Sequence, residues 1–135
     1  MTTTEQSPAP EQSPTPVARL AMLTLDAAEV EPLARFWEAV LGWPVVALTE
    51  DYAMLQGPSN ALGIGRIPDH VAPTWPDDGH KQFHLDLAAD DVEAAAQRCV
   101  ELGAVRADPQ PGETWVVLLD PAGHPFCISA AANWG

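Results

Sequence analysis

The residues best suited to chemistry in this sequence are a histidine and an aspartate two positions apart, and a cysteine much later in the chain. His84 and Asp86 belong to the run HKQFHLDL over residues 80–87, in which polar and apolar residues alternate. Successive side chains of a strand point to opposite faces, so both would lie on one face, where they could share a hydrogen bond or ligate a metal. The pattern fits equally well two side chains that face water or satisfy nearby backbone groups.

The cysteine falls near the C-terminus, where alternation places Cys127 and Ser129 on the face opposite to Phe126. A thiol beside an imidazole can act as a nucleophile, so one interpretation pairs Cys127 with His84 as its general base. The alternative is an inert buried thiol, because cysteine outside disulfides is among the most buried residue types. Cys99 follows the apolar stripe of an expected helix, which predicts a core position.

Two matching sets of elements would position these side chains. The first set is a strand over 20–25, a helix over 29–41 that ends at Gly42, and strands over 45–48, 52–56 and 62–67. The second set is a strand over 80–88, a helix over 90–102 that ends at Gly103, and strands over 105–107, 115–119 and 126–129. The helices are predicted from apolar stripes at the helical spacing, each followed by a glycine in the position that commonly ends a helix.

The two sets repeat each other in sequence as well as in order. The pair Leu-Gly at 41–42 recurs at 102–103, and Leu55 and Pro58 recur as Leu118 and Pro121. This repeat predicts an α+β domain over 17–135 made of two βαβββ modules. The segments of the chain are then a tail over 1–16, module one over 17–67, a connector over 68–79 and module two over 80–131. The tail has four prolines and no aliphatic pattern, which predicts a disordered or extended segment.

Three short motifs carry a resemblance to a known family. They are LARFW with LGW (33–37 and 41–43), PTWPD followed by QFHLDL (73–77 and 82–87), and LDPAGHPFC (119–127). Together they resemble the vicinal oxygen chelate superfamily, in particular its glyoxalase-like and bleomycin-resistance-like branch. The resemblance covers residues 17–131 and implies a curved mixed sheet, with the helices outside and a trough on its concave side.

The resemblance implies a metal site only in part. The metal enzymes of this superfamily hold a divalent ion with His, Gln or Glu, and the matching positions here are Met22, His84 and Cys127. A thioether and a thiol suit soft metals better than Mg, Mn, Ni or Fe, so we expect a metal-free site and no cofactor. Loops or a dimer partner could instead supply other histidines: His70, His80 and His124.

Composition argues against several other classes of function. The 135 residues are 47% hydrophobic, enough for the core of one domain. With 19 acidic and 6 basic residues, the net charge of −13 opposes binding to nucleic acid or to an anionic membrane. No apolar run reaches the roughly 20 residues of a membrane span, and the N-terminus has no signal-peptide pattern. The two cysteines show no CxxC spacing, so we expect a cytoplasmic protein.

The expected function is metal-independent binding of a small organic molecule. Members of the superfamily that lack the metal ligands include drug-sequestering resistance proteins, usually homodimers with the ligand at the subunit interface. The resemblance therefore implies an aromatic or cationic natural product as the ligand, antibiotic resistance as the role and a homodimer as the assembly. The expected ligand-binding residues are Met22, Thr24, Arg66, Trp75, His84, Asp86, Trp115 and Cys127.

Two other functions stay open at this point. One is a lyase or isomerase on the same fold, either with His84 as general acid or base oriented by Asp86, or with a metal completed by other ligands. The other is a structural or regulatory partner protein whose trough is inert.

Overall fold

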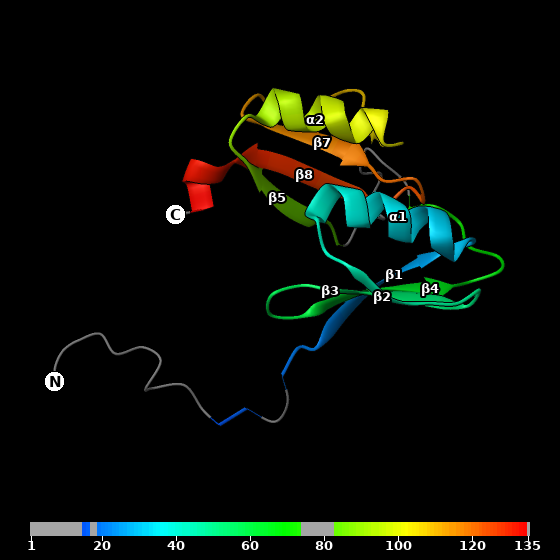
Figure 1. Ribbon diagram of the computed structural model, residues 1–135. Helices are drawn as coiled ribbons and strands as arrows, with labels where there is room; N and C mark the ends of the chain where they lie inside the picture. The colour runs from blue at the N-terminus through cyan, green and yellow to red at the C-terminus, as the bar shows by residue number, and fades with distance from the viewer. Residues whose placement is uncertain (1–14, 17–18, 74–82, 135) are drawn as a thin grey trace, which may run out of the picture.

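The computed structural model describes residues 15–16, 19–73 and 83–134 (Figure 1). Most of the expected tail and half of the expected connector lie outside the described residues, as do Trp75 and His80. Among the described residues, no helix is both long enough and apolar enough to span a membrane.

Module one is a four-stranded sheet with one helix. Its elements are β1 (Met22–Ala27), α1 (Val30–Leu41), β2 (Val45–Leu48), β3 (Tyr52–Gln56) and β4 (Ala61–Arg66). The strand order is β1-β4-β3-β2, with β1 and β4 parallel and the other pairs antiparallel.

Module two repeats this arrangement. Its elements are β5 (Leu85–Ala89), α2 (Val92–Glu101), β6 (Val105–Arg106), β7 (Trp115–Leu119) and β8 (Pro125–Ala130), followed by the short 3-10 helix η2 (Ala131–Trp134). The strand order is β5-β8-β7-β6, again with one parallel pair, β5 and β8. The predicted α+β fold of two βαβββ modules is therefore confirmed.

Local hydrogen bonds account for where α1 ends and where α2 begins. Gly42 follows α1 with a left-handed φ of 71°, and its N–H donates to the Glu38 carbonyl. At the start of α2, the Asp91 carboxylate accepts a hydrogen bond from the Ala94 N–H, which satisfies one of the unpaired donors of the first turn.

One strand prediction is wrong at its start. The alternation in 80–87 predicted that Phe83 faces the core with Leu85, but Phe83 is 83% exposed. The reason is that β5 begins only at Leu85, where the chain first pairs with Phe126 of β8. Phe83 precedes this ladder, so the pleat does not fix its direction.

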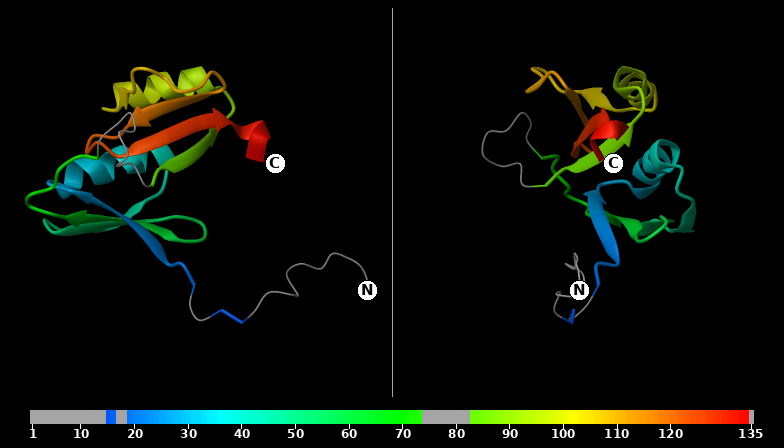
Figure 2. Two further views of the ribbon diagram at one scale, coloured as in Figure 1. Left: turned by 180° about the vertical axis from the view of Figure 1, so that it is seen from behind. Right: turned by 90° about the vertical axis from the view of Figure 1, so that its left-hand side faces the viewer.

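Both modules share one core, because the helices lie on the same side of the two sheets (Figure 2). Trp37 of α1 is fully buried and meets Phe36 and Phe126 edge-on, with ring centroids 5.0 Å away in both cases. Because Phe126 lies on β8, this aromatic cluster joins module one to module two.

A buried carboxylate reinforces that junction. Asp120, 3% exposed in the turn after β7, accepts hydrogen bonds from Trp37 Nε1 at 3.0 Å and from the N–H groups of Ala122 and His124 at 2.9 Å. The His124 ring also reaches back across the junction, with Nε2 2.7 Å from the carbonyl oxygen of Asp26 on β1.

Candidate functional site

Strand register brings the chemically competent side chains of module two together. Asp86 on β5 is the register partner of Cys127 on β8, and Cys127 in turn is opposite Val117 on β7. Register partners share a face of the sheet, and Phe126 and Ile128, which alternate with Cys127, are buried in the core that includes the helix residues. The Asp86–Cys127 row therefore lies on the face turned away from the helices.

An open pocket of about 500 Å³ lies on this face. The strands contribute Asp86, Trp115, Val117, Cys127 and Ser129 to its walls, and His84 lies directly before β5. The loop before β7 adds Pro111 and Thr114, and η2 adds Asn133. Four of the eight expected ligand-binding residues thus line one pocket: His84, Asp86, Trp115 and Cys127.

Three polar groups cluster on one wall of the pocket. His84 Nε2 is 3.5 Å from Asp86 Oδ2, and both side chains are partly exposed. The ligand atoms of His84, Asp86 and Cys127 all lie within 4.8 Å of one another. Cys127 is only 9% exposed, so its sulfur forms part of the floor, whereas the imidazole and the carboxylate reach solvent. This arrangement can move a proton, activate a thiol or hold a soft cation.

The aromatic wall of the pocket rests on a glycine. Trp115 is 38% exposed, and a Cβ placed on Gly112 would lie only 2.3 Å from its ring. The bare backbone at Gly112 therefore allows the six-membered ring of the indole to approach the loop closely. The spacing of apolar residues gives no sign of this contact, so it could not be predicted from the sequence.

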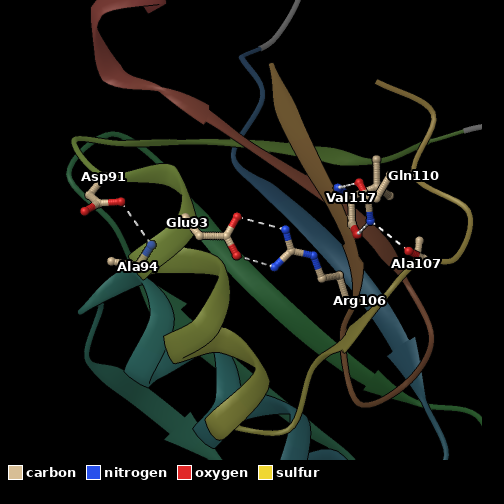
Figure 3. A network of polar contacts seen from close by, with 7 residues as sticks. All are labelled: Asp91, Glu93, Ala94, Arg106, Ala107, Gln110 and Val117. Atoms are coloured by element: carbon tan, nitrogen blue, oxygen red, sulfur yellow. Dashed lines mark hydrogen bonds and ion pairs between the residues drawn. The ribbon is translucent and has the colours of Figure 1, made fainter. Parts of the chain in front are cut away.

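The same loop is held to β7 by one glutamine (Figure 3). The Gln110 side-chain amide donates to the carbonyls of Ala107 and Val117 at 2.8 Å, and its Oε1 accepts from the Val117 N–H at 2.9 Å. In this way the side chain pairs with β7 just beyond the end of β6. Gln110 positions the loop that carries Pro111 and Thr114, and it was not among the predicted site residues.

Two of the other predicted residues lie on module one. Met22 packs across β4, where its sulfur would be 2.9 Å from a Cβ built on Gly63. Thr24 lines a crevice between the modules that His84 borders from the other side. Neither residue lines the pocket that contains Cys127.

Of the last two predicted residues, the one that the structure describes is also separate from the pocket. Arg66 lies at the end of β4, where it forms an exposed ion pair with Asp51 at 3.6 Å and lines a depression beside the start of α1. Trp75 lies outside the described residues. Of the alternative histidines, His70 and His124 pair at the module junction, with ring centroids 5.5 Å apart, and neither lines the pocket.

The residues present do not fit the hard divalent ion that the fold family implies. Of the three matching positions, His84 and Cys127 meet in the pocket, but Met22 packs against Gly63 on the other sheet. Asp86 takes the third place instead, which gives a nitrogen, a carboxylate oxygen and a sulfur. Mg and Mn prefer oxygen ligands, whereas this mixed donor set suits zinc.

The two cysteines differ in their surroundings. Cys99 is buried on α2, and burial raises the pKa of its thiol, which keeps it protonated near neutral pH. Cys127 instead forms part of a pocket wall beside an imidazole and a carboxylate. Both cysteines are therefore nearly buried, at 5% exposed for Cys99 and 9% for Cys127, and they differ in that Cys127 lines the candidate site.

Paired βαβββ modules with a pocket on the sheet face opposite the helices define the glyoxalase-like class of α+β proteins. A family model described as "Glyoxalase-like domain" matches residues 22–129. The chain therefore belongs to the glyoxalase-like family, within the vicinal oxygen chelate superfamily.

Solved structures show the same fold at low sequence identity. A glyoxalase/bleomycin resistance protein/dioxygenase family enzyme from Burkholderia phytofirmans has a TM-score of 0.64 at 16% identity, over 82% of this chain and 97% of that one. A lactoylglutathione lyase from Agrobacterium tumefaciens has a TM-score of 0.59 at 19% identity, over 90% and 99%. A bleomycin-binding protein from Streptomyces verticillus, solved with copper(II)-bleomycin, has a TM-score of 0.55 at 18% identity, over 84% and 98%. No curated protein matches this chain in sequence.

Proposed function

We propose that the protein binds a small organic molecule, without a metal, in the pocket of module two. The observation that carries the proposal is the composition of that pocket: a partly exposed indole faces the same space as the His84, Asp86 and Cys127 side chains. Aromatic walls with a few polar groups are typical of sites for flat organic ligands. The Met22 thioether lies on the other sheet, which supports binding without the family's metal.

The charge of the pocket favours a neutral or cationic aromatic compound. Among its described lining residues, Asp86 is acidic and none is lysine or arginine. The net charge of −13 adds to this preference, because a negative surface raises the local concentration of cations. Sequestration of such a natural product, as in antibiotic resistance, is the role we propose, and the structural similarity to a bleomycin-binding protein supports it. The proposed location is the cytoplasm, whose reducing conditions suit a protein with two thiols.

A homodimer is the proposed assembly. The pocket is open to solvent, and the matching face of module one exposes Met22 by 42% and Tyr52 by 52%. A second copy could cover these side chains and bring Met22 and Thr24 to the ligand. Light scattering coupled to size exclusion tests this proposal: a dimer mass supports it, and a monomer mass at ten times the ligand-binding concentration contradicts it.

Tryptophan fluorescence tests the binding proposal directly. We expect a flat aromatic cation, such as ethidium, to quench the protein with saturation, equally well with and without EDTA. Trp115→Phe should lose most of this quenching. Trp43→Phe is the matched control, because Trp43 packs against Gly57 in module one and should leave the quenching unchanged. If no compound in a broader panel of aromatic compounds quenches the fluorescence with saturation, the proposal is contradicted.

The donor cluster supports one second candidate, a lyase or isomerase that uses His84 as acid or base or whose metal is completed by Asp86. Three potential ligand atoms within 4.8 Å, facing an open pocket, resemble a zinc site with a vacant position for substrate. Titration with Co²⁺ distinguishes the two candidates. A thiolate-to-cobalt absorption band that saturates at one equivalent, survives Cys99→Ser and disappears in Cys127→Ser would replace the metal-free proposal.

A further inference from the structure

We infer that Cys127 is a nucleophile that captures flat α,β-unsaturated carbonyl compounds by covalent addition. This inference rests on the proposed function, since it assigns a ligand class and a chemical step to the same pocket. It adds a covalent bond to the binding of the electrophilic members of that ligand class.

Geometry provides the parts that thiol activation needs. The Cys127 sulfur and a His84 ring nitrogen lie within 4.8 Å, and the ring is 3.5 Å from the Asp86 carboxylate. A thiolate is the reactive form, so a base within reach of the sulfur is the first requirement. The carboxylate meets the second requirement, because it can orient the imidazole and stabilise its protonated form.

The positions of these residues follow from regular structure. Asp86 and Cys127 are register partners on neighbouring strands, so the pleat holds both on the pocket face. Opposite Cys127, Val117 is buried and anchored by Gln110. The sulfur therefore belongs to a rigid sheet rather than to a loop, as a nucleophile of defined direction requires.

The pocket favours a flat, uncharged and conjugated electrophile. Trp115 lines the pocket with a partly exposed indole, and its ring is held close to Gly112. The pocket wall carries a carboxylate and, among its described residues, no lysine or arginine, so an anionic electrophile would be repelled. An aryl enone meets these conditions, with its ring against the indole and its alkene toward the sulfur.

The proposed step needs no further reactant. His84 takes the Cys127 proton, and the thiolate forms a carbon–sulfur bond at the β-carbon of the enone. The electrons of the carbon–carbon double bond move onto the carbonyl oxygen to give an enolate, which takes the proton back from His84 at the α-carbon. Nothing leaves and nothing is oxidised, so the protein gains the full mass of the electrophile.

The probe for this inference is trans-chalcone, a flat aryl enone, added to the reduced full-length chain in EDTA at pH 7. Intact-mass and peptide spectra should show a single adduct, at Cys127. Cys127→Ser should show none, and Cys99→Ser should react like the wild-type protein, because Cys99 is buried in the core. An adduct at Cys99 as fast as at Cys127, or no adduct at all on the folded protein, would overturn the inference.

The role of the imidazole is tested by the rate. His84→Gln should slow the addition roughly 100-fold at pH 7, which is within the range for loss of a general base. Among the described residues lining the pocket, only His84, Asp86 and Cys127 carry acidic or basic groups. At about pH 9.5 hydroxide is abundant enough to take the place of the imidazole as the base, so the variant should recover to within about threefold of the wild-type rate. Equal rates at pH 7, or an equal deficit at both pH values, would contradict a base role for His84.

A non-reactive analogue separates this inference from the proposed function. Dihydrochalcone has the same rings and carbonyl but no double bond, so it can bind and cannot add. If it quenches Trp115 while chalcone forms no adduct, the inference fails and the proposed function stands. If chalcone forms the Cys127 adduct while neither dihydrochalcone nor the aromatic panel quenches, covalent capture stands and the proposal of reversible binding fails.

Discussion

Replacing Asp120 tests how the two modules are held together. The carboxylate is 3% exposed and accepts three hydrogen bonds, one of them from Trp37 Nε1 in the other module. Loss of one partner leaves a buried donor unsatisfied, at a cost of about 1–3 kcal/mol. Asp120→Ala removes the acceptor for all three donors, but the two backbone N–H groups are only partly buried and can turn to water. We therefore expect the free energy of unfolding to fall by roughly 3–5 kcal/mol.

Conservative variants divide this effect into its parts. Asp120→Asn keeps a carbonyl oxygen and should cost about 1–2 kcal/mol, because the remaining bonds lose the assistance of the charge. Trp37→Phe removes only the indole donor but also leaves space in a fully buried position, so about 2–4 kcal/mol is expected. The loss of roughly 3–5 kcal/mol expected for Asp120→Ala is a large share of the free energy of unfolding of a domain, which is about 5–15 kcal/mol.

The assay is equilibrium unfolding in urea, followed by circular dichroism. Asp51→Ala is the matched control, because it removes an exposed carboxylate whose ion pair with Arg66 is worth about 0–1 kcal/mol. A double-mutant cycle between Asp120→Asn and Trp37→Phe should show a coupling of about 1 kcal/mol. Strictly additive effects, or a cost below 1 kcal/mol for Asp120→Ala, would refute the argument that this hydrogen bond joins the modules.

Three further predictions concern the surface of module two and the loop beside the pocket. The two hydrogen bonds from Arg106 hold the pKa of Glu93 below its usual value (Figure 3). The ion pair therefore stabilises the folded protein above the carboxyl pKa of the unfolded chain, and this stabilisation is lost as pH falls through the lower pKa of the folded state. An NMR titration should locate that pKa, and an ordinary value in the native protein, or no change in Arg106→Gln, would contradict it. Gly112→Ala should displace the Trp115 ring and weaken quenching by aromatic ligands by tenfold or more, whereas unchanged quenching would show that the ring is not held by this contact. Gln110→Ala should cost about 1–3 kcal/mol in urea unfolding and weaken the same quenching, and an effect on neither would exclude a positioning role.

The sequence predicted the regular elements well because their signals are local. The bounds of β2, β3 and β7 were predicted to the residue, and the helix stop at Gly42 was correct. At Phe83 the prediction failed because alternation carries meaning only where a partner strand fixes the pleat. The first residue of a strand depends on where pairing with the neighbouring strand begins, and a local sequence pattern carries no information about this.

The sequence predicted which face of its strand each candidate side chain lies on, but not which of these residues meet in one pocket. Alternation put His84 and Asp86 on one face and Cys127 on the face opposite Phe126. That Asp86 and Cys127 are register partners depends on how two distant strands align, and the sequence does not state this alignment. The contributions of Gln110 and Gly112 were missed for a different reason: both act through contacts within an irregular loop, which leave no periodic pattern.

The internal repeat explains why the chemistry is confined to one module. In module one, Thr24 is the register partner of Gly63, as Asp86 is of Cys127 in module two. Gly63 has no side chain, and the Met22 sulfur and the Thr24 hydroxyl already lie 2.9 Å from where its Cβ would be. In module one, the exposed Met22 and Thr24 side chains therefore lie close to the position that corresponds to the Cys127 side chain in module two. From one backbone plan, the first module presents a thioether and a hydroxyl on this face, and the second presents a thiol, an imidazole and a carboxylate that face an open pocket.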